Sequence, residues 1–143
     1  MKARKYTIAV LQLALNNTPE NNLAKCKKWV KDAMEHADLV LIPTKASPLD
    51  IHSASSTLEW ASDAGSKVTW VINGASVFSS TPEIVFEQLK ATAKICRTIV
   101  HERNDFVISV GLGKSVNEFA PNSKSAAEID SLWREIKAML GRA

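Results

Sequence analysis

The sequence predicts an α/β fold: a single-domain three-layer sandwich with a four-stranded parallel sheet, in sequential strand order, and helices on both faces. Four apolar runs of strand length recur along the chain, at Thr7–Leu13, Ala37–Pro43, Lys67–Asn73 and Asp105–Leu112. Runs that are apolar on both faces suit strands buried in a parallel sheet. A helical pattern follows each run, and strand–helix repetition with short connections is typical of this architecture. With 143 residues, the chain has the length of one domain with a sizeable core.

The first two helical patterns have clear starts and stops. A helix is predicted from Thr18-Pro19-Glu20, because a capping residue, a proline at the first helical position and an acid near the positive end of the dipole follow one another. The residues of its inward stripe recur at helical spacing: Leu23, Cys26, Val30, Ala33 and Ala37. The next helix is predicted from about Asp50 to Ala64, with Gly65 as its stop.

Two further helices are predicted in the second half of the chain. One opens at Thr81-Pro82-Glu83, and its inward residues are expected to be Val85, Leu89, Ala93, Cys96 and Val100. The other carries Ser125-x-x-Glu128, the pattern of a capping box, and ends at Gly141.

The composition is that of an ordinary soluble globular protein. Apolar residues make up 45% of the chain, and the mean hydropathy is -0.08. No apolar run has the length of a membrane span, and Met1–Lys5 leads into a short strand and not a signal-peptide core. Cys26 and Cys96 fall in helical patterns, so we expect buried free thiols and a cytoplasmic location. The histidines are widely separated and share no ligand spacing, so no metal site is expected.

The net charge of +3 is unevenly distributed. Lysines and one arginine crowd the N-terminal quarter: Lys2, Arg4, Lys5, Lys25, Lys27, Lys28 and Lys31. A basic patch can attract nucleic-acid phosphates. A solvated helix face is the more common explanation, because no aromatic or arginine platform accompanies these lysines.

From Ala37 onward the chain resembles the C-terminal half of ParA-type partition ATPases, of the deviant P-loop class that includes MinD. The matching stretches come in the family's order: ADLVLIPTKASPLDI (37–51), KVTWVINGA (67–75), VHERNDF (100–106) and GKSVNEFAPNSKSAAEIDSLWREI (113–136). Together they span about three-quarters of the chain. The resemblance implies an ATP-dependent dimer that binds DNA without sequence preference and acts in plasmid or chromosome partition.

The parts that perform this family's catalysis have no counterpart in the sequence. No Gly-x-x-x-x-Gly-Lys-Ser/Thr string occurs, and the first strand ends in Gln12-Leu13 without an aspartate. Positioning and neutralising the γ-phosphate make up most of phosphoryl-transfer catalysis. We therefore expect a P-loop-NTPase-like half without the P-loop, with no ATPase activity and no cofactor.

The N-terminal part, residues 6–44, resembles the opening strand–helix–strand of the nitrilase, or carbon–nitrogen hydrolase, family. In that family the second strand ends in Pro-Glu, and the glutamate is the general base of a Glu-Lys-Cys triad. Thr44 occupies the matching position here and cannot accept a proton in that role. The resemblance divides the chain into a nitrilase-like unit, 1–36, and a ParA-like part, 37–143. Natural rearrangement or deliberate recombination of fragments explains such a joint, and its clean register favours the second.

The ParA resemblance also marks candidate binding residues. Asn73 and Pro121 match positions near the family's adenine site, although Asn-Gly is equally a plain turn signal. Basic residues near the C-terminus match the region of the family's DNA contacts: Lys124, Arg134, Lys137 and Arg142. Interleaved acids should keep any DNA binding weak and salt-sensitive.

Two functions therefore remain in view. The first is a non-catalytic α/β scaffold, a chimera of nitrilase-like and ParA-like fragments without ATPase or amidase activity. The second is a degenerate ParA-like partition protein that retains homodimerisation or weak non-specific DNA binding. Neither involves a membrane. For either one we expect the Thr7–Leu13 strand to pair in parallel with Leu39–Ile42, leaving Leu41 buried between helices on both faces.

Overall fold

A computed structural model describes residues 18–141 of the chain. The strand predicted at Thr7–Leu13, and its pairing, lie outside the described residues, as does Arg142.

The strands form a four-stranded parallel sheet. β1 (Val40–Thr44) pairs along its whole length with β2 (Val68–Ala75), from Val40 opposite Val68 to Thr44 opposite Ile72. β2 pairs in turn with β3 (Lys94–Ile95) and, further along, with β4 (Val100–His101). The prediction of an α/β fold with a parallel sheet is confirmed, and β1 and β2 are neighbours as predicted, but β3 and β4 fall in the segment that was predicted as the third helix. The chain order is not kept in space either, because β4 pairs with β2 and not with β3.

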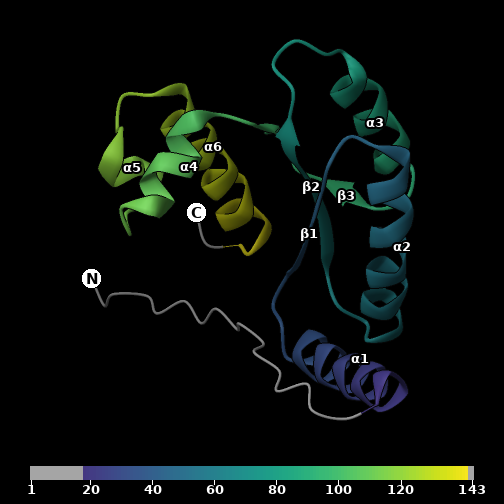
Figure 1. Ribbon diagram of the computed structural model, residues 1–143. Coiled ribbons are helices and arrows are strands. Elements are labelled where there is room, and N and C mark those ends of the chain that lie inside the picture. The colour runs from purple at the N-terminus through teal and green to yellow at the C-terminus, as the bar shows by residue number, and fades with distance from the viewer. Residues whose placement is uncertain (1–17, 142–143) are drawn as a thin grey trace.

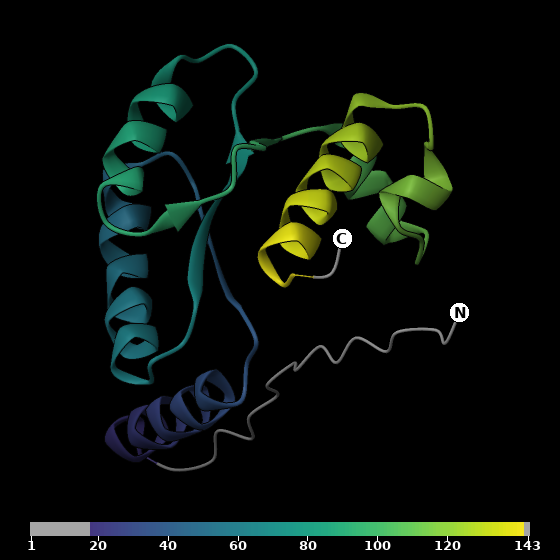
Figure 2. The same ribbon diagram turned by 180° about the vertical axis from the view of Figure 1, so that it is seen from behind.

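The helices lie on both sides of this sheet. α2 (Pro48–Asp63) and α3 (Thr81–Lys90) lie on one side, and α4 (Asn104–Gly111), α5 (Val116–Phe119) and α6 (Lys124–Met139) on the other (Figures 1 and 2). α1 (Pro19–Glu35) crosses the end of the sheet at which β1 begins (Figure 1). The starts of α1 and α2 follow from capping, because Thr18 Oγ1 accepts from Asn21 N and Ser47 Oγ accepts from Asp50 N.

The strand predicted at Asp105–Leu112 is wrong, because this segment forms α4. Its buried and half-buried positions are Asp105, Phe106 and Ser109, at helical spacing, whereas Val107 and Val110 are 74% and 76% exposed. That is the spacing of a helix with one face covered. The run of apolar β-branched residues reflects an uncovered helix face and not a buried strand.

The third predicted helix also ends earlier than expected. α3 stops at Lys90, so Ala93, Cys96 and Val100 are not helical. Thr92 explains the break: its hydroxyl donates to Leu89 O at 2.8 Å and accepts from the Trp70 indole at 3.0 Å. The chain then returns to the sheet, where Cys96 N donates to Trp70 O at 2.9 Å.

The main core lies between β1 and β2 on one side and α2 and α3 on the other. Its buried members are Ile42, Trp70, Ile72, Ala75, Val85 and Leu89. β2 is buried on both faces from Thr69 to Ile72, as predicted. The prediction for β1 is wrong, since Ile42 and Thr44 are buried but Leu41 is 40% exposed.

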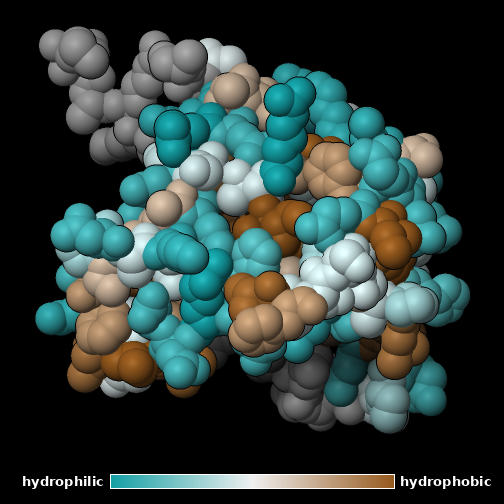
Figure 3. All heavy atoms as spheres, turned by 90° about the horizontal axis from the view of Figure 1, so that it is seen from above, coloured by the Kyte–Doolittle hydropathy of each residue, from teal (hydrophilic) through white to brown (hydrophobic). Residues whose placement is uncertain are grey.

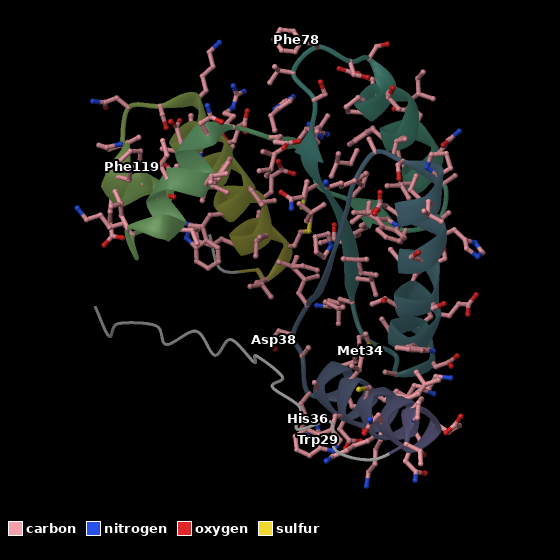
Figure 4. The ribbon with its side chains drawn as sticks, in the orientation of Figure 1. Trp29, Met34, His36, Asp38, Phe78 and Phe119 are labelled. Atoms are coloured by element: carbon pink, nitrogen blue, oxygen red, sulfur yellow. The ribbon has the colours of Figure 1, made fainter. Side chains whose placement is uncertain are left out.

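α1 does not bury its predicted stripe on the sheet. Leu23 is 54% exposed and Ala37 is exposed, and the buried residue of this helix is Met34. In Figure 4, Met34 points towards the rest of the molecule and Trp29 away from it. The described contacts join α1 to α2 and the loop after it: Lys31 pairs with Asp63 at 3.7 Å, and Ser66 Oγ donates to Met34 O at 2.7 Å.

Candidate functional site

The carboxyl ends of β1 and β2 form a polar pocket with a volume of about 410 Å³. Ligands of open parallel α/β sheets usually bind at this end of the strands. The pocket, here called the strand-end pocket, is lined by Pro43, Thr44, Lys45, Asp50, Ser53, Ala54 and Asn73. Figure 3 looks down on this end of the molecule and shows apolar side chains in separate clusters within a largely hydrophilic face.

Several polar groups of the strand-end pocket serve local structure. Thr44 is 5% exposed, and its hydroxyl donates to Lys45 O at 3.1 Å. Asp50 lies in the first turn of α2, where its carboxylate bonds to the capping hydroxyl of Ser47. The Lys45 side chain passes over Gly74, and a Cβ built there would lie 3.4 Å from Lys45 Cε. Gly74 has a φ of +64°, a backbone conformation that glycine accepts readily, and it lies where the β2–β4 pairing shifts register.

A second cavity, here called the groove, lies between the sheet and the helices α4 and α6, with a volume of about 530 Å³. Its wall on the sheet includes Leu41, Pro43 and Val71, and its wall on the helices includes Phe106, Val107, Ile129 and Leu132. His101 and Arg103 lie at its polar end together with Asn73.

A charged cluster around Glu128 joins α6 to the segment that contains β4. Glu128 Oε1 accepts from Arg103 Nη2 at 2.7 Å and lies 2.9 Å from His101 Nδ1, while Oε2 accepts from His101 N at 3.0 Å. Burial raises the pKa of the Glu128 carboxyl, but the hydrogen bonds from Arg103 and His101 outweigh it, so that the pKa is lowered. Arg103 Nε is buried without a hydrogen-bond partner among the described residues.

Glu135 repeats this arrangement further along α6. Its carboxylate accepts from Arg97 N at 2.7 Å, from Thr98 N at 2.9 Å and from the Thr98 hydroxyl. Sequence reasoning missed both glutamates, since their partners are 25 to 38 residues away. The capping box expected at Ser125 and Glu128 is wrong: Ser123 caps α6, and Ser125 Oγ donates to Asp105 Oδ2 at 2.8 Å.

The two candidate adenine residues do not line a common cavity among the two described above. Asn73 is exposed at the carboxyl end of β2 and lines both the strand-end pocket and the groove. Pro121 is exposed in the loop between α5 and α6 and lines neither.

The candidate DNA-binding residues within the described range all lie on α6. Lys124 and Arg134 are exposed, and Lys137 is partly buried. Lys124 and Lys137 are thirteen residues apart, or about 20 Å along a helix. Arg134 folds back along α6 to Asp130 O at 3.3 Å and Ser131 Oγ at 3.1 Å. These cations therefore make no compact basic cluster.

Residues 18–141 contain no group of three or more His, Cys, Asp or Glu side chains that could hold a metal ion. Cys26 and Cys96 are free, and burial raises the pKa of the Cys96 thiol. None of the described helices combines the length and apolar character needed to cross a membrane.

No family model matches the sequence, and no curated protein matches it.

Proposed function

We propose that the chain is a non-catalytic α/β scaffold, composed of a nitrilase-like unit and a ParA-like part, with neither ATPase nor amidase activity. The observation that carries this proposal is the chemistry at the carboxyl end of β1. By its resemblance, Thr44 occupies the position at which an amidase of the nitrilase kind needs a carboxylate; the residue is buried, and its hydroxyl donates to the adjacent Lys45 carbonyl. A neutral alcohol in that state does not act as a general base near pH 7.

The strand-end pocket is also poorly suited to a nucleotide triphosphate. Lys45 is a cation that could meet a phosphate, but the Asp50 carboxylate lines the same pocket at the start of α2. An acid in the first turn offsets the positive dipole end and repels an approaching anion. The Ser47 hydroxyl already accepts a hydrogen bond from Asp50 N, so fewer backbone N–H groups at the start of α2 are available to bind a phosphate.

In this proposal the two parts meet between residues 36 and 37, just before β1 begins. This strand pairs with β2 over five consecutive residues, and it contributes Ile42 to the core. A strand with continuous pairing and a buried face can accept a foreign helix at its amino end without loss of register. This supports the scaffold as a folded unit whether its origin is rearrangement or deliberate recombination.

The test measures nucleotide binding and amide hydrolysis on the full chain. Titration calorimetry with ATP and Mg²⁺ should give no heat of specific binding, and a panel of small amides should be hydrolysed no faster than by heat-denatured protein. A dissociation constant in the low micromolar range would contradict the proposal. Lys45→Gln is the informative variant and Lys90→Gln, an exposed lysine on α3, its matched control. ATP binding lost in the first and kept in the second would identify the pocket as a nucleotide site.

A second candidate function is a degenerate partition protein with weak DNA binding. The exposed cations Lys124 and Arg134 on α6 favour it, and Asp130 between them limits it. Mobility shifts over a salt series should then give binding at about 50 mM salt that is lost by about 200 mM. The double variant Lys124→Gln/Arg134→Gln should reduce the salt dependence, whereas Lys90→Gln should not. Binding that survives high salt, or that prefers one sequence, would contradict an electrostatic contact.

A further inference from the structure

The groove has the size and the lining of a small-molecule binding site. Its volume of about 530 Å³ lies within the roughly 300–1,000 Å³ of typical ligand pockets, which are mostly apolar with a few polar groups. Leu41 and Val71 line it on the sheet, and Ile129 and Leu132 line it on α6. Figures 1 and 2 show that these two apolar walls belong to separate layers of the fold.

The groove is elongated along the sheet. At one end lies Leu41, which pairs with Thr69 of β2, and at the other lies Glu102, whose N–H donates to Ala75 O at 2.9 Å. Thr69 and Ala75 are six residues apart, or about 20 Å along a strand. These dimensions fit a long, narrow ligand better than a compact one.

One charge at the polar end of the groove has no partner among the described residues. Three ionisable side chains line this end: His101, Glu102 and Arg103. Arg103 donates to Glu128 at 2.7 Å, and His101 Nδ1 lies 2.9 Å from the same carboxylate oxygen, so the charges of Arg103 and Glu128 compensate each other. The Glu102 carboxylate makes no hydrogen bond or ion pair within residues 18–141.

We propose that the groove binds an elongated apolar molecule that ends in an ammonium group. The ammonium lies next to Glu102, and the apolar body lies between the sheet and α6. Lys45, which passes over Gly74, lines the strand-end pocket and not the groove, so it does not compete for Glu102 there. Burial of the apolar body supplies most of the affinity, and the charge of Glu102 selects the end group. This binding site goes beyond the proposed scaffold function and requires no catalysis.

The test uses three ligands with one apolar body and different end groups: phenylbutylamine, phenylbutanol and phenylbutyrate. Each is titrated into the isotope-labelled full chain, and binding is followed by the chemical shifts of the backbone amides. The amides of Val71, Val107 and Leu132 should shift, with a dissociation constant of about 1 mM or below for the amine. The alcohol should bind about 3-fold more weakly than the amine, and the carboxylate about 10-fold more weakly.

Two pairs of variants separate the charge from the apolar wall. Glu102→Gln should abolish the preference for the amine and leave the affinity for the alcohol unchanged, whereas Glu59→Gln, on the exposed face of α2, should alter neither. Val107→Ser should weaken all three ligands by about 3-fold, because Val107 lines the groove. Val110→Ser makes the same change on an equally exposed residue of α4 that does not line the groove, and should have no effect.

Three outcomes would overturn the proposal. Phenylbutyrate that binds as tightly as phenylbutylamine would show that the end group is not selected by a carboxylate. A preference for the amine that survives Glu102→Gln would place the ammonium elsewhere. Amide shifts that are absent for all three ligands, or that leave Val71 and Leu132 unchanged, would show that the groove is not the binding site. None of these results depends on ATP binding or amide hydrolysis, so they leave the test of the scaffold function untouched.

Discussion

Replacing Glu128 by alanine should destabilise the protein by about 2–4 kcal/mol, because this carboxylate joins α6 to β4. The side chain is 16% exposed and accepts from the His101 backbone and from the Arg103 guanidinium. Hydrogen bonds to a charged group contribute about 1.5–3 kcal/mol each, but they are not additive and water can reach part of this site. Removing the acid also leaves the Arg103 charge largely buried without its counter-ion, which adds to the loss.

Thermal and denaturant unfolding followed by circular dichroism measure this effect. For a chain of this size, about 3 kcal/mol corresponds to a fall in Tm of roughly 10 °C. Glu128→Gln keeps the shape and one acceptor, so it should cost about half as much. Glu59→Gln makes the same chemical change on the exposed face of α2 and should leave Tm within about 1 °C. Equal Tm values for Glu128→Gln and Glu59→Gln would refute the assignment of Glu128 as a structural anchor.

The same contact predicts a pH dependence. The pKa of Glu128 in the folded protein is lowered from its ordinary value of 4.5. Its ionised form is therefore favoured by folding, and its contribution to stability is fully present above pH 4.5 and lost as the pH falls through the lowered pKa. The stability difference between the unaltered chain and Glu128→Gln should accordingly shrink below that pH. A difference that stays constant to low pH would mean that the charge of Glu128 contributes nothing.

Two further substitutions test the packing. Trp70→Phe removes a fully buried indole and its hydrogen bond to Thr92, and should lower the free energy of unfolding by about 2–3 kcal/mol in denaturant unfolding. An unchanged free energy of unfolding would contradict the placement of Trp70 in the core. Val30→Asp tests how deeply α1 is buried. Since Val30 is half-buried, we expect the free energy of unfolding to fall by about 1–2 kcal/mol in denaturant unfolding. Complete unfolding would show that α1 is buried on the sheet.

The first half of the described fold could be predicted from local signals. Thr18-Pro19 starts α1 as predicted, α2 starts at Pro48, two residues before the predicted start, and the parallel pairing of β1 with β2 follows from their apolar runs. These features depend on neighbours within one turn or one strand. Local chemistry is what a single sequence reports best.

The second half could not be predicted in the same way, because non-local contacts determine it. α3 ends where the Trp70 indole engages Thr92, 22 residues away in the sequence. α4 was mistaken for a strand because its exposed face is as apolar as a buried one, with Val107 and Val110 both largely exposed. Of the predicted binding residues, Asn73 lines the strand-end pocket. The partners of Glu128, His101 and Arg103, lie in a segment whose secondary structure was predicted wrongly.

The two glutamates of α6 explain why the sheet ends in two short strands and not one long one. β3 and β4 have two residues each. Beside them Cys96 N and Glu102 N still donate to β2, whereas three other backbone donors of this segment face α6. The N–H groups of Arg97 and Thr98 are satisfied by Glu135, and that of His101 by Glu128. Glu128 and Glu135 are about two turns, or about 10 Å, apart on one face of α6, which matches the rise of about three residues of extended backbone, as from Thr98 to His101. The carboxylates thus take the place of a neighbouring strand.

It follows that α6 is required for this edge of the sheet to form, because without it three backbone donors would lack partners. Acids on an amphipathic helix ordinarily indicate a solvated face, but Glu128 and Glu135 instead accept hydrogen bonds from the backbone of the neighbouring segment.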